Sequence, residues 1–175
     1  MSTTIHNIKG VEIKIGVSTA DIDPREGDCL SKMVLLHNRW RIGDPHNYKQ
    51  EDYKSWDELA RGILRDNPNA VILPVYMYDH SGLAFSTGPF SCPWDSGQVG
   101  FIFFPLKDYR EAHGIKRVSK KMRKEMEETL TQVVQDYSDE LNQTYYYFKI
   151  EDEPSVHGFT SEEDALESAK IEIGA

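Results

Sequence analysis

Cysteine is scarce in this chain, and long apolar runs are absent. The two cysteines, Cys29 and Cys92, are too few for a disulfide framework. The longest apolar run, 99–106, has the length of a strand and falls far short of the roughly 20 residues that a membrane helix needs. Residues 1–10 carry no apolar core of a secretory signal. These absences favour a reducing, cytoplasmic setting without a membrane partner.

Basic residues are also in the minority. The 175 residues include 20 Lys and Arg against 29 Asp and Glu, which gives a net charge of -9. Phosphate backbones repel such a protein at long range, so general nucleic-acid binding is disfavoured. The sequence has no Walker loop, no Gly-x-Gly-x-x-Gly turn, no EF-hand loop and no His-Glu-x-x-His pair. It therefore predicts neither a cofactor nor a metal.

The chain does contain enough apolar residues for a core. Hydrophobic residues make up 39% and aromatic residues 11% of the sequence, as in one ordinary domain. Apolar patterns predict strands over 11–17, 71–78, 83–87, 98–106 and 145–151. Capping residues predict a helix after Ser55, a long helix from Ser119 to about Asn142, and a short last helix after Thr160. The prediction is a single α+β domain, 1–175, with a mainly antiparallel sheet, one long helix and two shorter ones.

Polar side chains concentrate over 76–98, in two loops between apolar strands. Loops held by a rigid sheet are common sites of function, and glycines and prolines fix their shape here. Two interpretations of the turn at 79–82 stay open. Either Asp79 and Ser81 hydrogen-bond the turn backbone, or His80 is a general base or ligand donor oriented by a carboxylate.

Cys92 lies in the second loop, between Ser91 and Pro93. It is either a small buried side chain, as free cysteines usually are, or a nucleophile. A nucleophilic cysteine needs a base, for which His80 is the candidate. It also needs an orienting carboxylate, for which Asp79 or Asp95 qualifies.

The end of the second loop combines an aromatic ring with short polar side chains. It is either an aromatic plug followed by a turn, or part of a small-molecule pocket. In the pocket, Trp94 and Tyr78 would stack on a flat ring such as a nucleobase. Asp95, Ser96 and Gln98 would supply directional hydrogen bonds. A metal site is not expected, because neighbouring residues on an extended chain point apart.

Two charged clusters lie outside these loops. Residues 32–40 form a short apolar run that periodicity assigns equally to a strand or a helix turn. On an extended segment, His37 and Arg39 share one face and are either a phosphate grip or a solvated face with local salt bridges. The basic residues between Lys107 and Lys124 are either a solvated helix face or a contact for an acidic partner or a second subunit.

These motifs carry a resemblance. From about Asp28 to the C-terminus, the sequence resembles a family of small bacteriophage proteins, and only 1–27 lies outside. The match rests on M-x-x-x-H-x-R-x-x-x-G-D from Met33, on P-V-Y-M-Y-D-H-S-G from Pro74, and on P-F-S-C-P-W-D-S-G-Q-V-G-F-I from Pro89. The resemblance implies a phage origin and the host cytoplasm. By analogy with small acidic phage proteins that act against host immunity, it also implies a counter-defence role.

Three functions follow as hypotheses. In the first, the 76–98 loops bind and sequester a small nucleotide-derived ligand, such as a host immune signal. The residues assigned to this ligand are His37, Arg39, Tyr78, Asp79, Ser81, Trp94, Asp95, Ser96 and Gln98. In the second, the same site is a metal-independent phosphodiesterase, with His80 as general base and Cys92 or water as the nucleophile. In the third, the chain blocks a host defence enzyme by direct contact.

Overall fold

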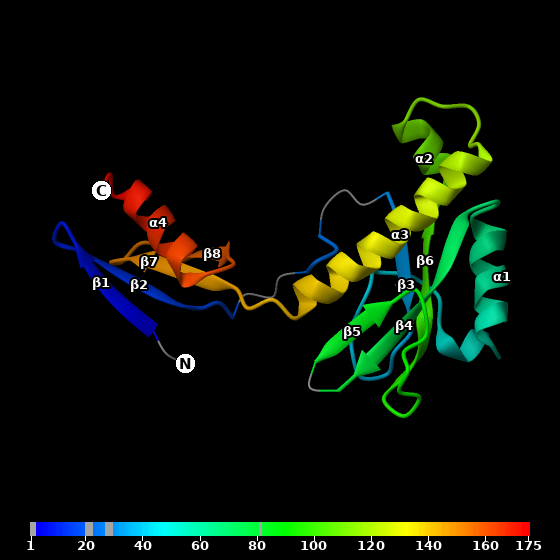
Figure 1. Ribbon diagram of the computed structural model, residues 1–175, viewed down its shortest axis with the longest axis horizontal. Helices are drawn as coiled ribbons and strands as arrows, with labels where there is room; N and C mark the ends of the chain where they lie inside the picture. The colour runs from blue at the N-terminus through cyan, green and yellow to red at the C-terminus, as the bar shows by residue number, and fades with distance from the viewer. Residues whose placement is uncertain (1–2, 20–22, 27–29, 81) are drawn as a thin grey trace. The chain divides into compact units, whose positions relative to one another are not determined.

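The computed structural model describes residues 3–19, 23–26, 30–80 and 82–175 (Figure 1). The chain divides into two compact units, one made of 1–23 and 143–175 and the other of 24–142. We call them the terminal unit and the central unit. Each has its own four-stranded antiparallel sheet and its own buried apolar residues. The α+β class is therefore confirmed, whereas the sequence predicts one domain with one main sheet.

The terminal unit is a sheet covered by one helix. In sheet order its strands are β1 (Thr3–Ile8), β2 (Val11–Val17), β7 (Tyr146–Ile150) and β8 (Val156–Phe159). Helix α4 (Glu162–Glu172) buries Ala165 and Ala169 in a cluster with Ile13, Ile15 and Phe148. This helix begins after Ser161, whose Oγ accepts a hydrogen bond from the Asp164 N–H, and not after Thr160 as the sequence predicts.

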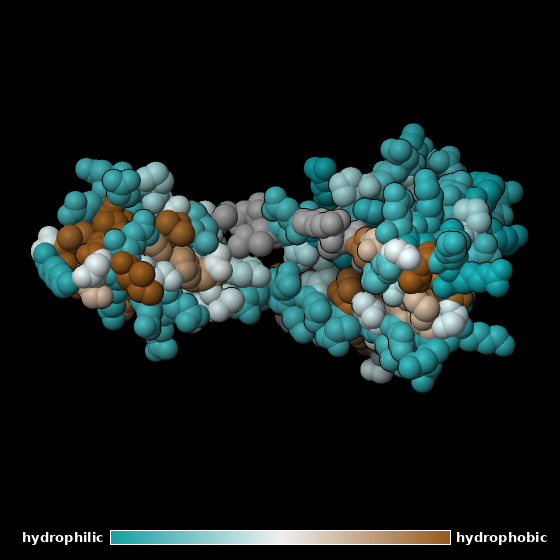
Figure 2. All heavy atoms as spheres, turned by 90° about the horizontal axis from the view of Figure 1, so that it is seen from above, coloured by the Kyte–Doolittle hydropathy of each residue, from teal (hydrophilic) through white to brown (hydrophobic). Residues whose placement is uncertain are grey.

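The surface of the terminal unit carries apolar side chains among polar ones. Ile5, Val156 and Ile171 are exposed, and Figure 2 shows brown apolar surface scattered over this unit. Single exposed apolar residues are normal on a protein surface. Among the described residues, no helix combines the length and the apolar character that crossing a membrane requires.

The central unit is a second sheet with helices packed against it. In sheet order its strands are β3 (Lys32–Leu35), β6 (Ser96–Phe104), β4 (Val71–Asp79) and β5 (Leu83–Ser86). Helix α1 (Trp56–Asp66) packs Leu59 and Ile63 in a cluster with Phe101 and Phe103. Helix α3 (Lys120–Leu141) packs in a second cluster with Met33, Val75, Met77, Phe85 and Ile102. Neighbouring residues of β6 enter different clusters, as alternation along a strand requires.

Two short elements complete the central unit. A single 3-10 turn spans Gln50–Asp52, and helix α2 spans Leu106–Ala112. The described residues thus form four α-helices rather than the three that the sequence predicts. Helix α2 is the additional one. It takes up the last residue of the predicted strand at 98–106, because β6 ends at Phe104 and Pro105 is the N-cap of the helix.

The loop after β3 is held against that strand by a buried ion pair. Arg25 donates to both carboxylate oxygens of Asp44 at 2.9 Å, and the two side chains are only 3% and 14% exposed. Asp44 Oδ2 also accepts the Met33 N–H at 2.7 Å. Gly43 has a φ of +71°, and a Cβ there would lie 2.7 Å from the Met33 carbonyl oxygen. These contacts hold Asp44 beside Met33. The chain between β3 and Asp44 therefore forms a loop, and this loop contains Arg39 and Trp40.

Candidate functional site

Most of the described residues that the sequence assigns to a site lie at one end of the central sheet. Strand β4 ends at Asp79, whose N–H donates to the Asp95 carbonyl at 2.9 Å. Tyr78 pairs with Ser96 at the start of β6. The end of β4 and the loop that precedes β6 are thereby joined. We call this region the loop surface; it comprises Arg39, Trp40, Tyr78–His80 and Cys92–Ser96.

Asp79 connects the 37–40 segment to the end of β4. Its Oδ2 accepts the indole N–H of Trp40 at 3.1 Å and lies 3.8 Å from a guanidinium nitrogen of Arg39. The guanidinium also stacks on the Trp40 ring, 4.6 Å from the ring centroid. His37 is engaged locally, since its Nδ1 accepts the N–H groups of Arg39 and Trp40. The structure thus brings Arg39 to the predicted loops and gives His37 a turn-forming contact.

Asp95 is the second carboxylate of the loop surface, and it has two partners. Its Oδ2 lies 3.6 Å from His80 Nδ1 and 3.7 Å from Cys92 Sγ, which donates to it. The thiol therefore contacts a carboxylate, and no Cys92–His80 hydrogen bond occurs in this part of the described chain. A cysteine nucleophile needs a base or a positive charge beside its sulfur. The carboxylate that Cys92 contacts is only a weak base and is itself negatively charged, so it disfavours a thiolate beside it.

The remaining predicted residues differ in how many contacts they make within the fold and in how far they are exposed. The Tyr78 ring lies between the rings of His80 and Phe90, with centroid distances of 5.9 and 5.7 Å. Ser96 donates to the Cys92 carbonyl, and the Gln98 amide donates to the Gly100 carbonyl at 3.2 Å. Trp94 differs from all of these because 92% of it is exposed. Ser81 lies outside the described residues.

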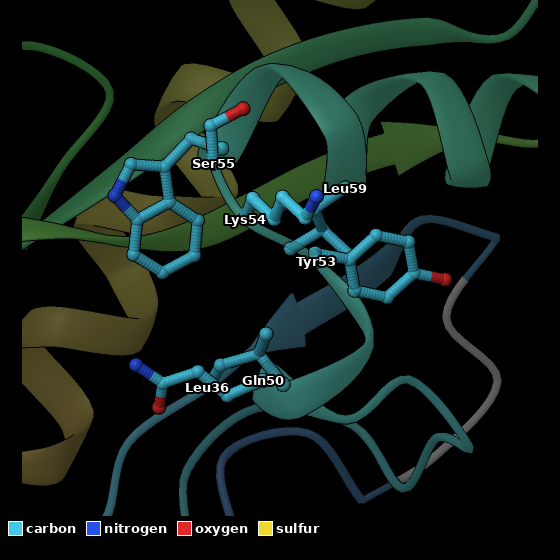
Figure 3. A pocket seen from close by; sticks show the side chains of 7 residues that line it. Leu36, Gln50, Tyr53, Lys54, Ser55 and Leu59 are labelled. Atoms are coloured by element: carbon cyan, nitrogen blue, oxygen red, sulfur yellow. The ribbon is translucent and has the colours of Figure 1, made fainter.

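Two cavities of the central unit are lined by residues to which the sequence analysis gives no binding or catalytic role, although Asp44 of the second cavity ends the motif that begins at Met33. The first has a volume of about 280 Å³ and is lined by Leu36, Gln50, Tyr53–Trp56 and Leu59. Figure 3 shows Leu36 and Gln50 across the opening from Lys54 and Ser55. Its walls are mainly apolar. The signal in the sequence is weak, because Ser55 is explained as a helix cap and Leu59 as a core residue.

The second cavity has a volume of about 470 Å³ and is more polar. Its aromatic and charged lining residues are Lys32, Asp44, His46, Tyr48, Tyr53, Asp66, Phe103 and Asp108. Burial, together with the hydrogen bond to Asp66, raises the pKa of Tyr48 to about 12. A signal for this cavity does exist in the sequence: Tyr48 and Tyr53 are aromatic residues in the otherwise polar stretch 43–55.

Comparison with known proteins assigns no function to the loop surface or to the two cavities. The chain matches no family model, no curated protein and no solved structure. Within the described ranges, no three His, Cys, Asp or Glu side chains are grouped so that they could hold a metal ion. The contacts described above are therefore the basis on which function is inferred.

Proposed function

We propose that the chain is a binding protein that sequesters a small nucleotide-derived ligand at the loop surface. The observation that carries this proposal is the exposure of Trp94, of which 92% faces solvent. Its loop is held by the Ser96–Cys92 hydrogen bond and by the Asp79–Asp95 backbone hydrogen bond. An indole presented on a fixed loop is ready to stack on a planar ring, and stacking on a nucleobase contributes about 1–3 kcal/mol.

Groups that can bind a phosphate lie on the same surface. The positively charged Arg39 side chain is 70% exposed, and the His80 side chain, which can donate an N–H, is 66% exposed. Arg39 is held by stacking on Trp40 and lies 3.8 Å from Asp79, so most of its five N–H donors stay available to a ligand. Asp79 and Asp95 connect Arg39, His80 and the Trp94 loop through the contacts given above. A base and a phosphate can thus be recognised by neighbouring groups.

The geometry favours binding over catalysis. The Cys92 thiol faces a carboxylate, and His80 and Asp95 are both substantially exposed to water. Catalytic groups gain most of their effect in sites that exclude water. The test must separate binding from two alternatives. The first is phosphodiester cleavage at the loop surface, and the second is direct inhibition of a host enzyme.

The test follows the fate of the ligand. Purified protein is incubated with cyclic dinucleotides and cyclic ADP-ribose isomers, and free ligand is measured by chromatography before and after heat denaturation. We expect depletion of one compound and its intact recovery on heating. New product peaks would identify an enzyme instead, and His80→Ala would then be the next variant. No depletion of any compound would contradict the proposal and favour a protein partner.

Trp94→Ala is expected to weaken binding of the depleted compound about tenfold, because the stacking energy is lost. Ile171→Ala is the matched control, since it removes another exposed apolar side chain, 74% exposed, from the terminal unit. Cys92→Ser should weaken binding much less than Trp94→Ala does, because a serine hydroxyl can still donate to Asp95. Equal affinity of wild type and Trp94→Ala in isothermal titration calorimetry would refute the assignment of Trp94.

A further inference from the structure

The second cavity described above has the size of a small-molecule site. Its volume is about 470 Å³, within the range of roughly 300–1,000 Å³ that is typical of ligand pockets. It lies among β3, the 44–48 segment, the C-terminal end of α1 and the start of α2. None of its lining residues belongs to the loop surface.

A row of aromatic rings forms one wall of this cavity. The ring centroids of His46 and Tyr48 are 6.0 Å apart, and those of Tyr48 and Tyr53 are 6.3 Å apart. All three residues line the cavity. The faces of aromatic rings carry partial negative charge and attract cations.

The cavity offers several hydrogen-bond acceptors, together with the amide side chains of Asn47 and Asn67, which can also donate. Asp66 and Asp108 line it, while Asp44 is already occupied by Arg25. Tyr48 donates its hydroxyl proton to Asp66 at 2.9 Å. His46 Nε2 lies 2.9 Å from the Leu35 carbonyl and therefore carries the ring proton. In the neutral ring Nδ1 is an acceptor, and it is buried without a hydrogen-bond partner among the described residues.

The charge of the cavity wall is negative. Lys32 is the basic residue in the lining, against Asp66 and Asp108. Arg65 lies 3.8 Å from Asp66, but both side chains are more than half exposed, so this ion pair neutralises little. Aromatic rings and carboxylates favour the same chemistry in a ligand, which is positive charge carried on N–H groups.

We infer that this cavity is a second binding site and that it takes a small organic cation with N–H donors, a primary ammonium or a guanidinium compound. The ring faces hold the cation, and Asp66 and Asp108 accept its hydrogen bonds. The site does not depend on the function proposed for the loop surface, and its ligand has the opposite charge.

Agmatine, which carries both groups, is the probe. We expect saturable binding in calorimetry of the full chain, with amide chemical-shift changes at Tyr48, Asn67 and Asp108. Butylurea, a neutral compound with N–H donors, should bind at least tenfold more weakly, because it lacks the charge. Absence of saturable agmatine binding, equal binding of butylurea, or shifts confined to other residues would each overturn the inference.

Charge variants test the sign of the ligand. Asp108→Asn should weaken agmatine binding about threefold, and Lys32→Met should tighten it by a similar factor, since each changes one exposed charge at the cavity. Both residues are exposed, so both variants should fold. Lys116→Met removes an exposed lysine outside the lining and is the matched control. Tighter binding to Asp108→Asn, or weaker binding to Lys32→Met, would refute a cationic ligand. Trp94→Ala should leave agmatine binding unchanged.

Discussion

The phenol of Tyr48 couples folding of the central unit to alkaline pH. Burial and the hydrogen bond to Asp66 raise its pKa from 10.0 to about 12. The folded state therefore holds the phenol proton more tightly than the unfolded state does. The resulting stabilisation is complete below pH 10 and is lost as the pH rises from 10 through about 12.

Tyr48→Phe removes this titration and should flatten part of the alkaline pH dependence. The free energy of unfolding, measured with urea between pH 8 and 12, should fall less steeply for the variant than for wild type above pH 10. Ile171→Ala keeps Tyr48, removes no titratable group and serves as the control, with the wild-type slope. Identical slopes for Tyr48→Phe and wild type would show that this phenol does not contribute.

The roles of single residues were only partly predictable, and the 37–40 segment shows why. The sequence places His37 and Arg39 on one face of an extended segment. The structure ends β3 at Leu35, and His37 then accepts hydrogen bonds from the backbone two and three residues ahead. Arg39 reaches Asp79, which lies 40 residues further along the chain. Contacts of this range depend on how elements pack, and the local pattern does not contain that information.

At the scale of elements, the backbones of β3 and β6 lie so close together at Gly100 that a side chain at this position would not fit between them. Gly100 pairs with Leu35 of β3 on one side and with Val75 of β4 on the other. A Cβ at Gly100 would lie 2.0 Å from the Val34 carbonyl oxygen, which is backbone and cannot turn away. The close strand pairing therefore requires glycine at this position.

Gly100→Ala should destabilise the central unit by about 3 kcal/mol, because β3 must move away from β6 to admit the methyl group. Gly97→Ala is the matched control in the same strand, since a Cβ there meets nothing within 4 Å. Urea unfolding followed by far-ultraviolet circular dichroism measures both. A loss for Gly100→Ala no larger than that for Gly97→Ala would contradict the close approach.

Most elements were predictable where the local signal is strong. Strand β2 covers the predicted 11–17, and α1 and α3 begin after Ser55 and Ser119, whose hydroxyls accept the expected N–H groups. Strand β1 was not predicted, because Thr, His and Asn interrupt its apolar residues. Helix α2 was not predicted either, since the apolar run of β6 continues into its first residue.

At the scale of the whole molecule, the two units differ in charge. The terminal unit contains 4 Lys and Arg and 11 Asp and Glu, a net charge of -7, whereas the central unit contains 16 and 18, a net charge of -2. Most of the net negative charge thus belongs to the terminal unit, which contributes no residue to the loop surface. An anionic ligand that binds at the loop surface meets the nearly neutral central unit, which supports the proposed function.

The central unit is a continuous segment, and this allows a test of where binding resides. Residues 24–142 contain one complete sheet and two buried clusters, so the fragment should fold and unfold cooperatively in urea. It also contains the whole loop surface, and we expect it to deplete the same nucleotide as the full chain. Leu130→Ala, which truncates a fully buried side chain, should cost the fragment about 2–5 kcal/mol and serves as the folding control. A folded fragment that no longer depletes the ligand would mean that the terminal unit contributes to the binding site.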